Sequence, residues 1–560
     1  MVNMHANGLA LADYAVVISF FAVMISVGIF FGRQQKSMTQ FFGGGKQVPW
    51  WLSGISFYMC SFSALAFVMY SALAYKFGWL PITISWLSVP AVLIGCRVFA
   101  ARWRRVSETS ALEYIEHRYG NGMRQGLMWL GLPMRVLDDA FKLLAIGTVV
   151  GVGLGFPLQG AIIASGLIIL SYTFLGGLWA TLVADFIQFF VILVVVLVLP
   201  FLCLAKVGGV SAFLEQVPIG FFRFTADKYD WTYMLIFFLI IFFNLSTSWT
   251  MVQRYYSTRS ERDARKVGYL VAILLTIGPP FFFMPAMAAR ILLPEIPPER
   301  MNEVYALICK NVLPVGFMGM VLAAMFSATM STLAGDYNAV ASTLTNDFYK
   351  RMIAPEATGR QQMVVARLAT LLVGVLVIGL TFVMQQAQGA NDLFDMTNRM
   401  FGVFLPPIAI PMMLGLITRR ISRRGGVTGL LGGIAVGFSV FVLGALWPEL
   451  RTTGTLFVVT CLATFGGLIM GTLIWPNHAR HDEELTRFFE KVETPGAILT
   501  GAPVRMTFWP LVAGGLGFIG SVLIITSVAT CPLAEVKLSV MGGVGLLAVA
   551  ALFFGLSRKA

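Results

Sequence analysis

Residues 317–350 read FMGMVLAAMFSATMSTLAGDYNAVASTLTNDFYK, a long apolar helix that carries a line of small hydroxyls and an acid. Ala328, Ser331 and Thr332 are three and four residues apart and share one helix face, with Asp336 a turn further along. In lipid such a face is costly unless it lines a cavity or binds a ligand. It predicts either half of an alkali-cation site, because hard cations prefer oxygen ligands, or a packing face of small residues.

The composition around this helix indicates a membrane protein. Of the 560 residues, 58% are hydrophobic and 12% are charged, and many apolar runs exceed the ~18 residues needed to cross a bilayer. The net charge of +13 is spread over short loops rather than one soluble face, so it indicates topology and not a nucleic-acid partner. The sequence predicts an all-α polytopic protein in contact with the lipid bilayer, with no obligatory protein partner.

The order of the apolar runs predicts about fifteen spans, beginning near residues 14–32. This first run follows Asp13 and has no basic residue before it, so we expect it to be retained rather than cleaved as a signal peptide. Basic residues concentrate in the loops of one side, which predicts an outside N-terminus and a cytoplasmic C-terminus in the plasma membrane. The long hydrophilic stretches near 101–123, 250–266 and 476–505 are then cytoplasmic.

The sequence lacks the residues that several classes of chemistry require. The six cysteines show no CxxC spacing, and all four histidines fall outside the apolar runs, which argues against a histidine metal site or proton relay in the membrane. The sequence contains no GxxxxGK[ST] loop, so nothing in it indicates a nucleotide-driven pump. Asp138 and Asp139 are about 100° apart on a helix and do not resemble a proton-sharing dyad. We therefore expect no enzyme activity.

Two apolar runs that lie five spans apart are interrupted by polar residues. Ser61 and Ser63 fall in the run at 50–75, and a cluster beginning at Asn244 ends the run at 231–249. Transporters bind solutes where two such helices unwind near the midplane, because free carbonyls and helix ends can then coordinate a ligand. The spacing fits the first helices of two five-helix inverted repeats. Packing serines in ordinary helices are the alternative.

The run at 124–152 carries four charges, which are costly in mid-membrane. Arg135, Asp138, Asp139 and Lys142 fall within one stripe about 100° wide and sum to zero. The stripe predicts either the wall of a substrate cavity, where Arg135 can bind a carboxylate in a bidentate manner, or a self-neutralised ladder that packs against a neighbouring helix.

The stretch SYTFLGGLWATLVADFIQ, from Ser171 to Gln188, resembles the YTxxGGxxAxxxxDxxQ signature of the sodium:solute symporter family. Other pieces follow in the family's order: FFGGGKQVPWW at 41–51, TSALEYIEHRYG at 109–120, VQRYYSTRSERDARK at 252–266 and the serine-bearing helix. The resemblance implies a LeuT-like fold with one leading helix, a five-plus-five inverted repeat and about four trailing helices. The implied units are the leading helix and its cytoplasmic loop (1–49), a ten-helix transport core (50–418, repeats about 50–204 and 231–418), accessory helices (419–475), a cytoplasmic loop (476–505) and two additional C-terminal helices (506–560).

The same resemblance implies a sodium ion between the broken second span and the serine-bearing helix. Its ligands would be the backbone carbonyls of Met59, Phe62 and Ala328 and the hydroxyls of Ser331 and Thr332.

Asp185 matches the acid of the signature, which in some members supports a second sodium ion or the gating network. Its hydroxyl partners there correspond to Ala334 and Gly335, which offer no side-chain oxygen. A second sodium site of that type is not expected, although Asp336 could substitute for the missing ligands.

The substrate is less well defined by the resemblance. Positions that hold sugar hydroxyls in the glucose branch differ here, which disfavours a hexose. Arg135 falls where the sialic-acid branch binds its carboxylate, whereas that branch's threonine and glutamine are replaced by Ala66 and Ser85. We expect a small carboxylate-bearing solute. One candidate is an amino acid, whose ammonium would pair with Asp138 or Asp139. The candidate substrate residues are Ser61, Ser63, Ser85, Ser88, Arg135, Asp138, Asp139 and Asn244.

Together these features predict a sodium-coupled symporter that imports a small polar solute by alternating access, with sodium as the only metal. A proton-coupled transporter of the same fold and a membrane solute sensor without transport are the alternatives.

Overall fold

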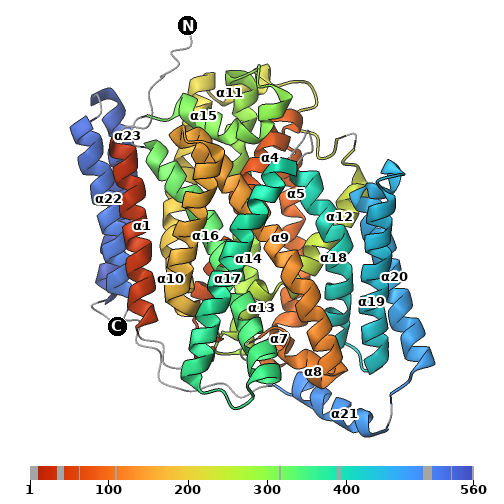
Figure 1. Ribbon diagram of the computed structural model, residues 1–560. Helices are drawn as coiled ribbons and strands as arrows, with labels where there is room; N and C mark the ends of the chain where they lie inside the picture. Colours follow the sequence, from red (N-terminus) through yellow and green to blue (C-terminus); the bar gives the residue numbers. More distant parts are fainter. Residues whose placement is uncertain are drawn as a thin grey trace.

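The computed structural model describes residues 11–33, 43–61, 63–106, 110–226, 228–314, 317–387, 393–477, 479–495, 508–530 and 533–557. Its ordered elements are helices, as predicted, and Figure 1 shows them packed side by side along one direction. The α-helices are α1 (Leu11–Gly32), α3 (Trp50–Cys60), α4 (Ala64–Phe77), α5 (Leu80–Trp86), α6 (Ser88–Gly95), α7 (Ala101–Val106), α8 (Glu113–Tyr119), α9 (Asn121–Leu154), α10 (Leu158–Val207), α11 (Val210–Gln216), α12 (Trp231–Thr247), α13 (Trp249–Tyr256), α14 (Glu261–Leu292), α15 (Val304–Val312), α16 (Phe317–Thr343), α17 (Gly359–Ala387), α18 (Leu393–Gly415), α19 (Arg423–Leu443), α20 (Thr453–Ile474), α21 (Ala479–Glu493), α22 (Trp509–Thr530) and α23 (Leu533–Ser557). Short 3-10 or π segments cover Gly44–Lys46, Cys96–Ala100, Pro298–Glu303, Leu344–Ile353 and Pro448–Arg451.

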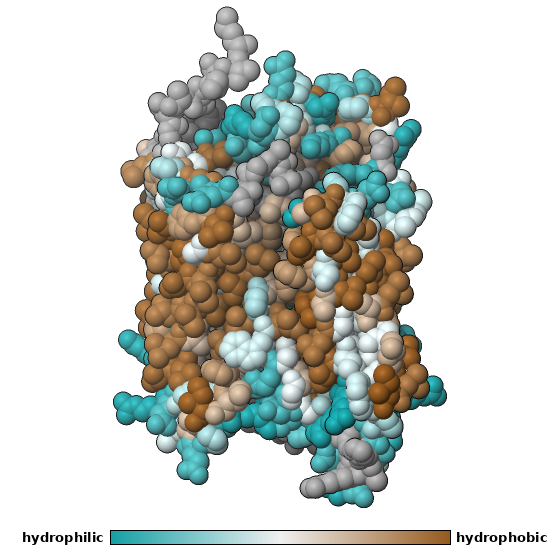
Figure 2. All heavy atoms as spheres, turned by 45° about the vertical axis from the view of Figure 1, so that its right-hand side comes forward, coloured by the Kyte–Doolittle hydropathy of each residue, from teal (hydrophilic) through white to brown (hydrophobic). Residues whose placement is uncertain are grey.

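The molecule has the surface of a membrane protein. Figure 2 shows a wide band of hydrophobic side chains around its middle and hydrophilic side chains at both ends. Ten of the described helices are long and apolar enough to cross a bilayer, or thirteen if each bent pair is one span. The sequence predicted about fifteen spans, which is two more than thirteen. The prediction counts α9 and the start of α10 as separate spans, although the structure pairs them across a 118° turn, and it also counts α18 as a span.

Helix α16 is the centre of the packing. Every one of its residues is buried, and it contacts α1, α3, α9, α10 and α17. A helix with no face toward lipid can carry small and polar residues on all sides, because each side meets protein rather than hydrocarbon.

The two polar interruptions are breaks in the helices, as the serine clusters predicted. The chain bends by 56° between α3 and α4, and by 50° between α12 and α13 at Ser248. Hydroxyls next to each break bond to the preceding turn: Ser61 donates to the Phe57 carbonyl at 2.8 Å and Thr247 to the Phe243 carbonyl at 2.7 Å. Such local bonds compete with the regular helical ladder and favour a bend.

Helix α10 contains another change of direction, at the second glycine of the signature motif. Gly177 has φ 59° and ψ −169°, a conformation open to glycine because it has no Cβ. The segment Gly177–Val207 therefore forms a span of its own, and it carries Asp185 toward α3.

The C-terminal helices pack on the leading helix. Helices α22 and α23 form a hairpin beside α1, as Figure 1 shows. Trp509 of α22 stacks on Trp51 of α3, with ring centroids 5.4 Å apart, and on Phe553 of α23 at 5.0 Å. The extra hairpin is thus tied to the N-terminal end of the first broken helix.

The stretch 476–505, expected to be a loop, contains the helix α21. Leu485, Phe488, Phe489 and Val492 are spaced as one apolar helix face and are buried. The aromatic ring of Phe488 stacks on Tyr114 of α8 with centroids 6.0 Å apart. This short amphipathic helix packs on α7 and α8, a docking that the sequence analysis did not predict.

Candidate functional site

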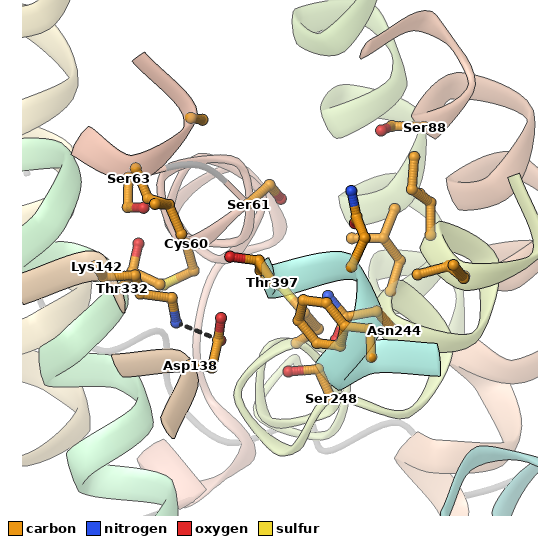
Figure 3. Close-up of a pocket in the computed structure, with 18 of the residues that line it drawn as sticks. Cys60, Ser61, Ser63, Ser88, Asp138, Lys142, Asn244, Ser248, Thr332 and Thr397 are labelled. Atoms are coloured by element: carbon orange, nitrogen blue, oxygen red, sulfur yellow. Dashed lines mark ion pairs between the residues drawn. The ribbon is translucent and has the colours of Figure 1, made fainter. Parts of the chain in front are cut away.

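A cavity of about 210 Å³ lies between the two broken helices and α9, α16 and α18. We call it the central cavity. Figure 3 shows Lys142 and Asp138 on one side of it and Asn244 on the opposite side. Phe62 lies outside the described residues. Of the other predicted residues, Ser61, Ser63, Ser88, Arg135, Asp138, Asn244, Thr332 and Asp336 line the central cavity, whereas Met59, Ser85, Asp139, Asp185, Ala328 and Ser331 do not.

The hydroxyl face of α16 lies directly against the break between α3 and α4. The backbone N–H of Ala64, the first residue of α4, donates to the Thr329 hydroxyl at 3.0 Å. On the other side of the break, the Cys60 sulfur lies 3.5 Å from both the hydroxyl and the carbonyl oxygen of Ser331. Met59 is fully buried beside these contacts. The structure therefore brings together the two elements that were predicted to share a sodium ion.

The oxygen atoms at this junction suit an alkali cation. Thr332 donates its hydroxyl proton to the Ala328 carbonyl at 3.0 Å, which places two of the predicted ligand oxygens next to each other. Ser331 and Ala328 are fully buried, and Thr332 also faces the central cavity. Hydroxyl and carbonyl oxygens are hard ligands that favour Na⁺ over transition metals.

The charge stripe of α9 is part of a larger group of charges. We define the ionic cluster as Arg135, Asp138, Asp139, Lys142 and, from α16, Asp336. The Lys142 ammonium lies 2.8 Å from Asp138, 3.0 Å from Asp139 and 2.9 Å from Asp336. Arg135 pairs with Asp336 at 2.9 Å. Two positive and three negative side chains give the ionic cluster a formal charge of −1, where the stripe alone sums to zero.

The stripe therefore combines side chains that face the central cavity with ion pairs to a neighbouring helix. Arg135, Asp138 and Lys142 face the central cavity, while the Asp139 side chain is fully buried behind them. The Arg135 guanidinium also lies over the indole of Trp249, 4.8 Å from the ring centroid. Trp249 follows the break at Ser248, so this contact joins α9 to the second broken helix.

A separate network surrounds Asp185. Ser56 of α3 donates to the Asp185 carboxylate and accepts a hydrogen bond from Arg254 Nε at 3.1 Å. The Arg254 guanidinium lies 3.7 Å from Asp185, and both side chains are almost completely buried. Arg254 therefore supplies the positive charge that balances Asp185.

The Asp185 network reaches α16 at Gly335. A Cβ atom on Gly335 would lie 2.8 Å from Thr250 Cγ2 and 3.3 Å from Arg254 Nη2, so the guanidinium packs closely against this glycine. Thr250 also donates to Asp336 and accepts from Arg254 through its carbonyl at 3.1 Å. Asp185 and Asp336 thus belong to two networks that meet at Thr250.

Two of the predicted substrate residues lie apart from the cavity wall. The Ser85 hydroxyl donates to the Pro81 carbonyl at 2.8 Å, one turn back on its own helix. Asp139 contributes its charge from behind Lys142. Sequence reasoning assigned no role to Arg254, Cys60 or Thr329. The one available signal was Arg254, a charged residue directly after an apolar run within the VQRYY motif.

Comparison with known proteins agrees with this architecture. The family model described as "Sodium:solute symporter family" matches residues 41–433. The sodium/sialic acid symporter NanT of Aliivibrio fischeri is 25% identical over 88% of this chain and 99% of its own length. A sodium/glucose cotransporter of Vibrio parahaemolyticus is 25% identical over 78% of this chain and 86% of its own length.

A solved structure has the same fold. It is the substrate-bound, outward-open state of a Na⁺-coupled sialic acid symporter, with a TM-score of 0.72, 22% identity, and coverage of 83% of this chain and 98% of the other. This chain belongs to the sodium:solute symporter family. It is accordingly a multi-pass membrane transporter of LeuT-like fold and not an enzyme.

Proposed function

We propose that this protein couples the entry of Na⁺ to the uptake of a small, polar, carboxylate-bearing solute by alternating access. The observation that carries the proposal is the contact of α16 with the α3–α4 break, through Ala64–Thr329 and Cys60–Ser331. Thr332 from the same helix face also lines the central cavity. A cation held at this junction would therefore stabilise the wall on which the solute binds.

In this proposal Na⁺ is ligated by the hydroxyls of Ser331 and Thr332 and the carbonyls of Ala328, Met59 and Phe62. The first four are supported by the position of α16 against α3, and Phe62 rests on the family resemblance. Sodium would tie the first broken helix to α16 and favour the state in which the solute cavity is formed.

Arg135 is the proposed partner of the solute carboxylate. It lines the central cavity, and an arginine can bind a carboxylate through two parallel N–H donors. The sialic acid carried by two relatives also bears a carboxylate, which agrees with this assignment.

Transport would be driven by the difference in sodium concentration between the two sides of the plasma membrane. In this proposal the N-terminus lies outside and the C-terminus lies in the cytoplasm. The ten-helix core, residues 50–418, would close over both ligands and then open to the cytoplasm. A membrane potential adds ~2.3 kcal/mol per charge per 100 mV to the driving force.

The test is transport by purified protein in proteoliposomes. An inward Na⁺ gradient should drive uptake of a carboxylate-bearing solute from a mixed panel, and uptake should stop when an ionophore collapses the gradient. Uptake driven by a proton gradient in the absence of Na⁺ would refute sodium coupling. Sodium-dependent solute binding without flux would support the sensor instead.

A further inference from the structure

Hydrogen-bonding capacity in the ionic cluster is distributed unevenly. A lysine ammonium has three N–H donors, and those of Lys142 face the carboxylates of Asp138, Asp139 and Asp336 at 2.8–3.0 Å. Lys142 therefore has no donor left for a ligand. Asp336 already accepts from Lys142, Arg135 and the Thr250 hydroxyl.

Arg135 retains donors that face the central cavity. Of its five N–H groups, one donates to Asp336 at 2.9 Å and another to the Ser248 hydroxyl at 3.4 Å. Three N–H groups have no partner among the described residues, and the side chain lines the cavity with 14% of its surface exposed.

Asp138 retains acceptors in the same way. Within the described part of the chain its ion pair is with Lys142, through one oxygen. A carboxylate offers about four acceptor positions, so most of its capacity is unused. It is the most exposed acid of the ionic cluster, at 19% against 5% for Asp336 and 0% for Asp139. Figure 3 shows it at the cavity, with the ion pair to Lys142 drawn as a dashed line.

The lining of the central cavity includes a group of large apolar side chains as well as polar ones. The apolar group is Phe237, Ile240, Ile241, Phe394 and Phe401, and polar residues such as Ser88, Asn244 and Thr397 line the same cavity. An aliphatic or aromatic substituent would be buried favourably against the apolar group.

We propose that the solute is a zwitterion with an apolar substituent, whose ammonium binds Asp138 while its carboxylate binds Arg135. This inference rests on the proposed function and defines its substrate class. Residues three apart on a helix face are about 5–6 Å apart at Cβ, a spacing that suits an amine and a carboxylate on one or two carbons. Lys142 and Asp336 are positioning residues, which hold the two binding side chains toward the cavity.

Charge balance supports the same class of solute. With all five side chains ionised the ionic cluster sums to −1, and a bound Na⁺ beside Thr332 would then bring the site to zero. A zwitterion leaves that sum unchanged, while an anion would restore an unbalanced buried charge, which is costly in a membrane interior. Asp138 would therefore determine specificity by rejecting solutes that have a carboxylate and no ammonium.

The test compares matched solutes by thermal stabilisation of the full-length protein in detergent, in Na⁺ and in choline. The zwitterions are L-leucine, L-proline and L-phenylalanine. Each is paired with its amine-free acid (4-methylpentanoate, cyclopentanecarboxylate, 3-phenylpropanoate) and its carboxyl-free amine (3-methylbutylamine, pyrrolidine, phenethylamine). We expect at least one zwitterion to stabilise the protein in Na⁺ at a concentration at least tenfold lower than either of its analogues.

The outcomes separate this inference from the proposed function. Sodium-dependent stabilisation by an acid at concentrations equal to or below those of its zwitterion would overturn the inference and leave the symporter proposal standing. The same applies if N-acetylneuraminate or D-glucose stabilises the protein and no zwitterion does. An absence of any sodium-dependent shift would refute both.

A variant gives an independent test. Asp138→Asn should weaken zwitterion binding at least tenfold and improve binding of the amine-free acid relative to the zwitterion, because the excess negative charge is removed. Asp263→Asn is the matched control, since Asp263 pairs with Lys266 at 3.8 Å outside the cavity. An unchanged preference in Asp138→Asn would refute the assignment of Asp138, because a merely structural role does not reverse selectivity.

Discussion

Removal of two hydroxyls from α16 tests the proposed sodium site most directly. The perturbation is the double substitution Ser331→Ala with Thr332→Ala. Thr332 donates to its own helix at 3.0 Å, while Ser331 meets the Cys60 sulfur at 3.5 Å and hydrogen-bonds the buried Asp185 carboxylate. Their loss should therefore lower folding stability by on the order of 1 kcal/mol for Thr332 and by about 1.5–3 kcal/mol for Ser331, whose partner is a carboxylate.

The double substitution should also weaken sodium affinity. A contact between a hydroxyl and a charged partner is worth ~1.5–3 kcal/mol, so loss of two weakens binding by at least about 3 kcal/mol, or roughly 150-fold. For a dissociation constant of roughly 5 mM, Na⁺ at about 150 mM stabilises the folded protein by about 2 kcal/mol. After a ~150-fold loss the same concentration contributes about 0.1 kcal/mol.

The assay is thermal unfolding of the purified protein during titration with NaCl at constant ionic strength with choline chloride. The control is Ser327→Ala with Thr343→Ala, which removes two buried hydroxyls of α16 that bond to their own helix at 2.7 and 3.1 Å. Control and wild type should respond alike to Na⁺, and the Ser331/Thr332 double variant should not respond. A sodium response of normal size and midpoint in that variant would refute the site.

Two further predictions follow from the networks around the site. Because Arg254 balances the charge of Asp185, we expect one bound sodium ion and a Hill coefficient near one in sodium titrations of the wild type; a coefficient near two would show that a second ion binds and would contradict this prediction. Trp509→Ala should remove the stacking on Trp51 and Phe553 and lower the melting temperature by an amount that reflects ~3–5 kcal/mol. The midpoint of the sodium titration should not change in that variant, and a shifted midpoint would mean that the C-terminal hairpin takes part in ion binding.

The sequence predicted the breaks in the first and second broken helices, because serine and threonine clusters interrupted runs that were otherwise apolar. It did not predict the docking of α21 on α8, because that contact joins segments that are far apart in the chain. It also left open whether the charge stripe of α9 lines a cavity or packs against a neighbouring helix. The neighbouring charge on α16, Asp336, is 194 positions away from Lys142 in the chain, and no local pattern connects the two residues.

The sequence by itself determined the class of protein. Hydrophobic runs of bilayer length can satisfy their backbone only as helices, and the ordered motifs from residue 41 to the serine-bearing helix identified the family. Only the tertiary structure decided which charges belong to the cavity and which are neutralised behind it. Asp138 and Asp139 are neighbours of the same type, yet one lines the cavity and the other is enclosed. Packing against α16 sets this difference in burial. A position on a helix is buried or faces a cavity according to whether a neighbouring helix covers that face.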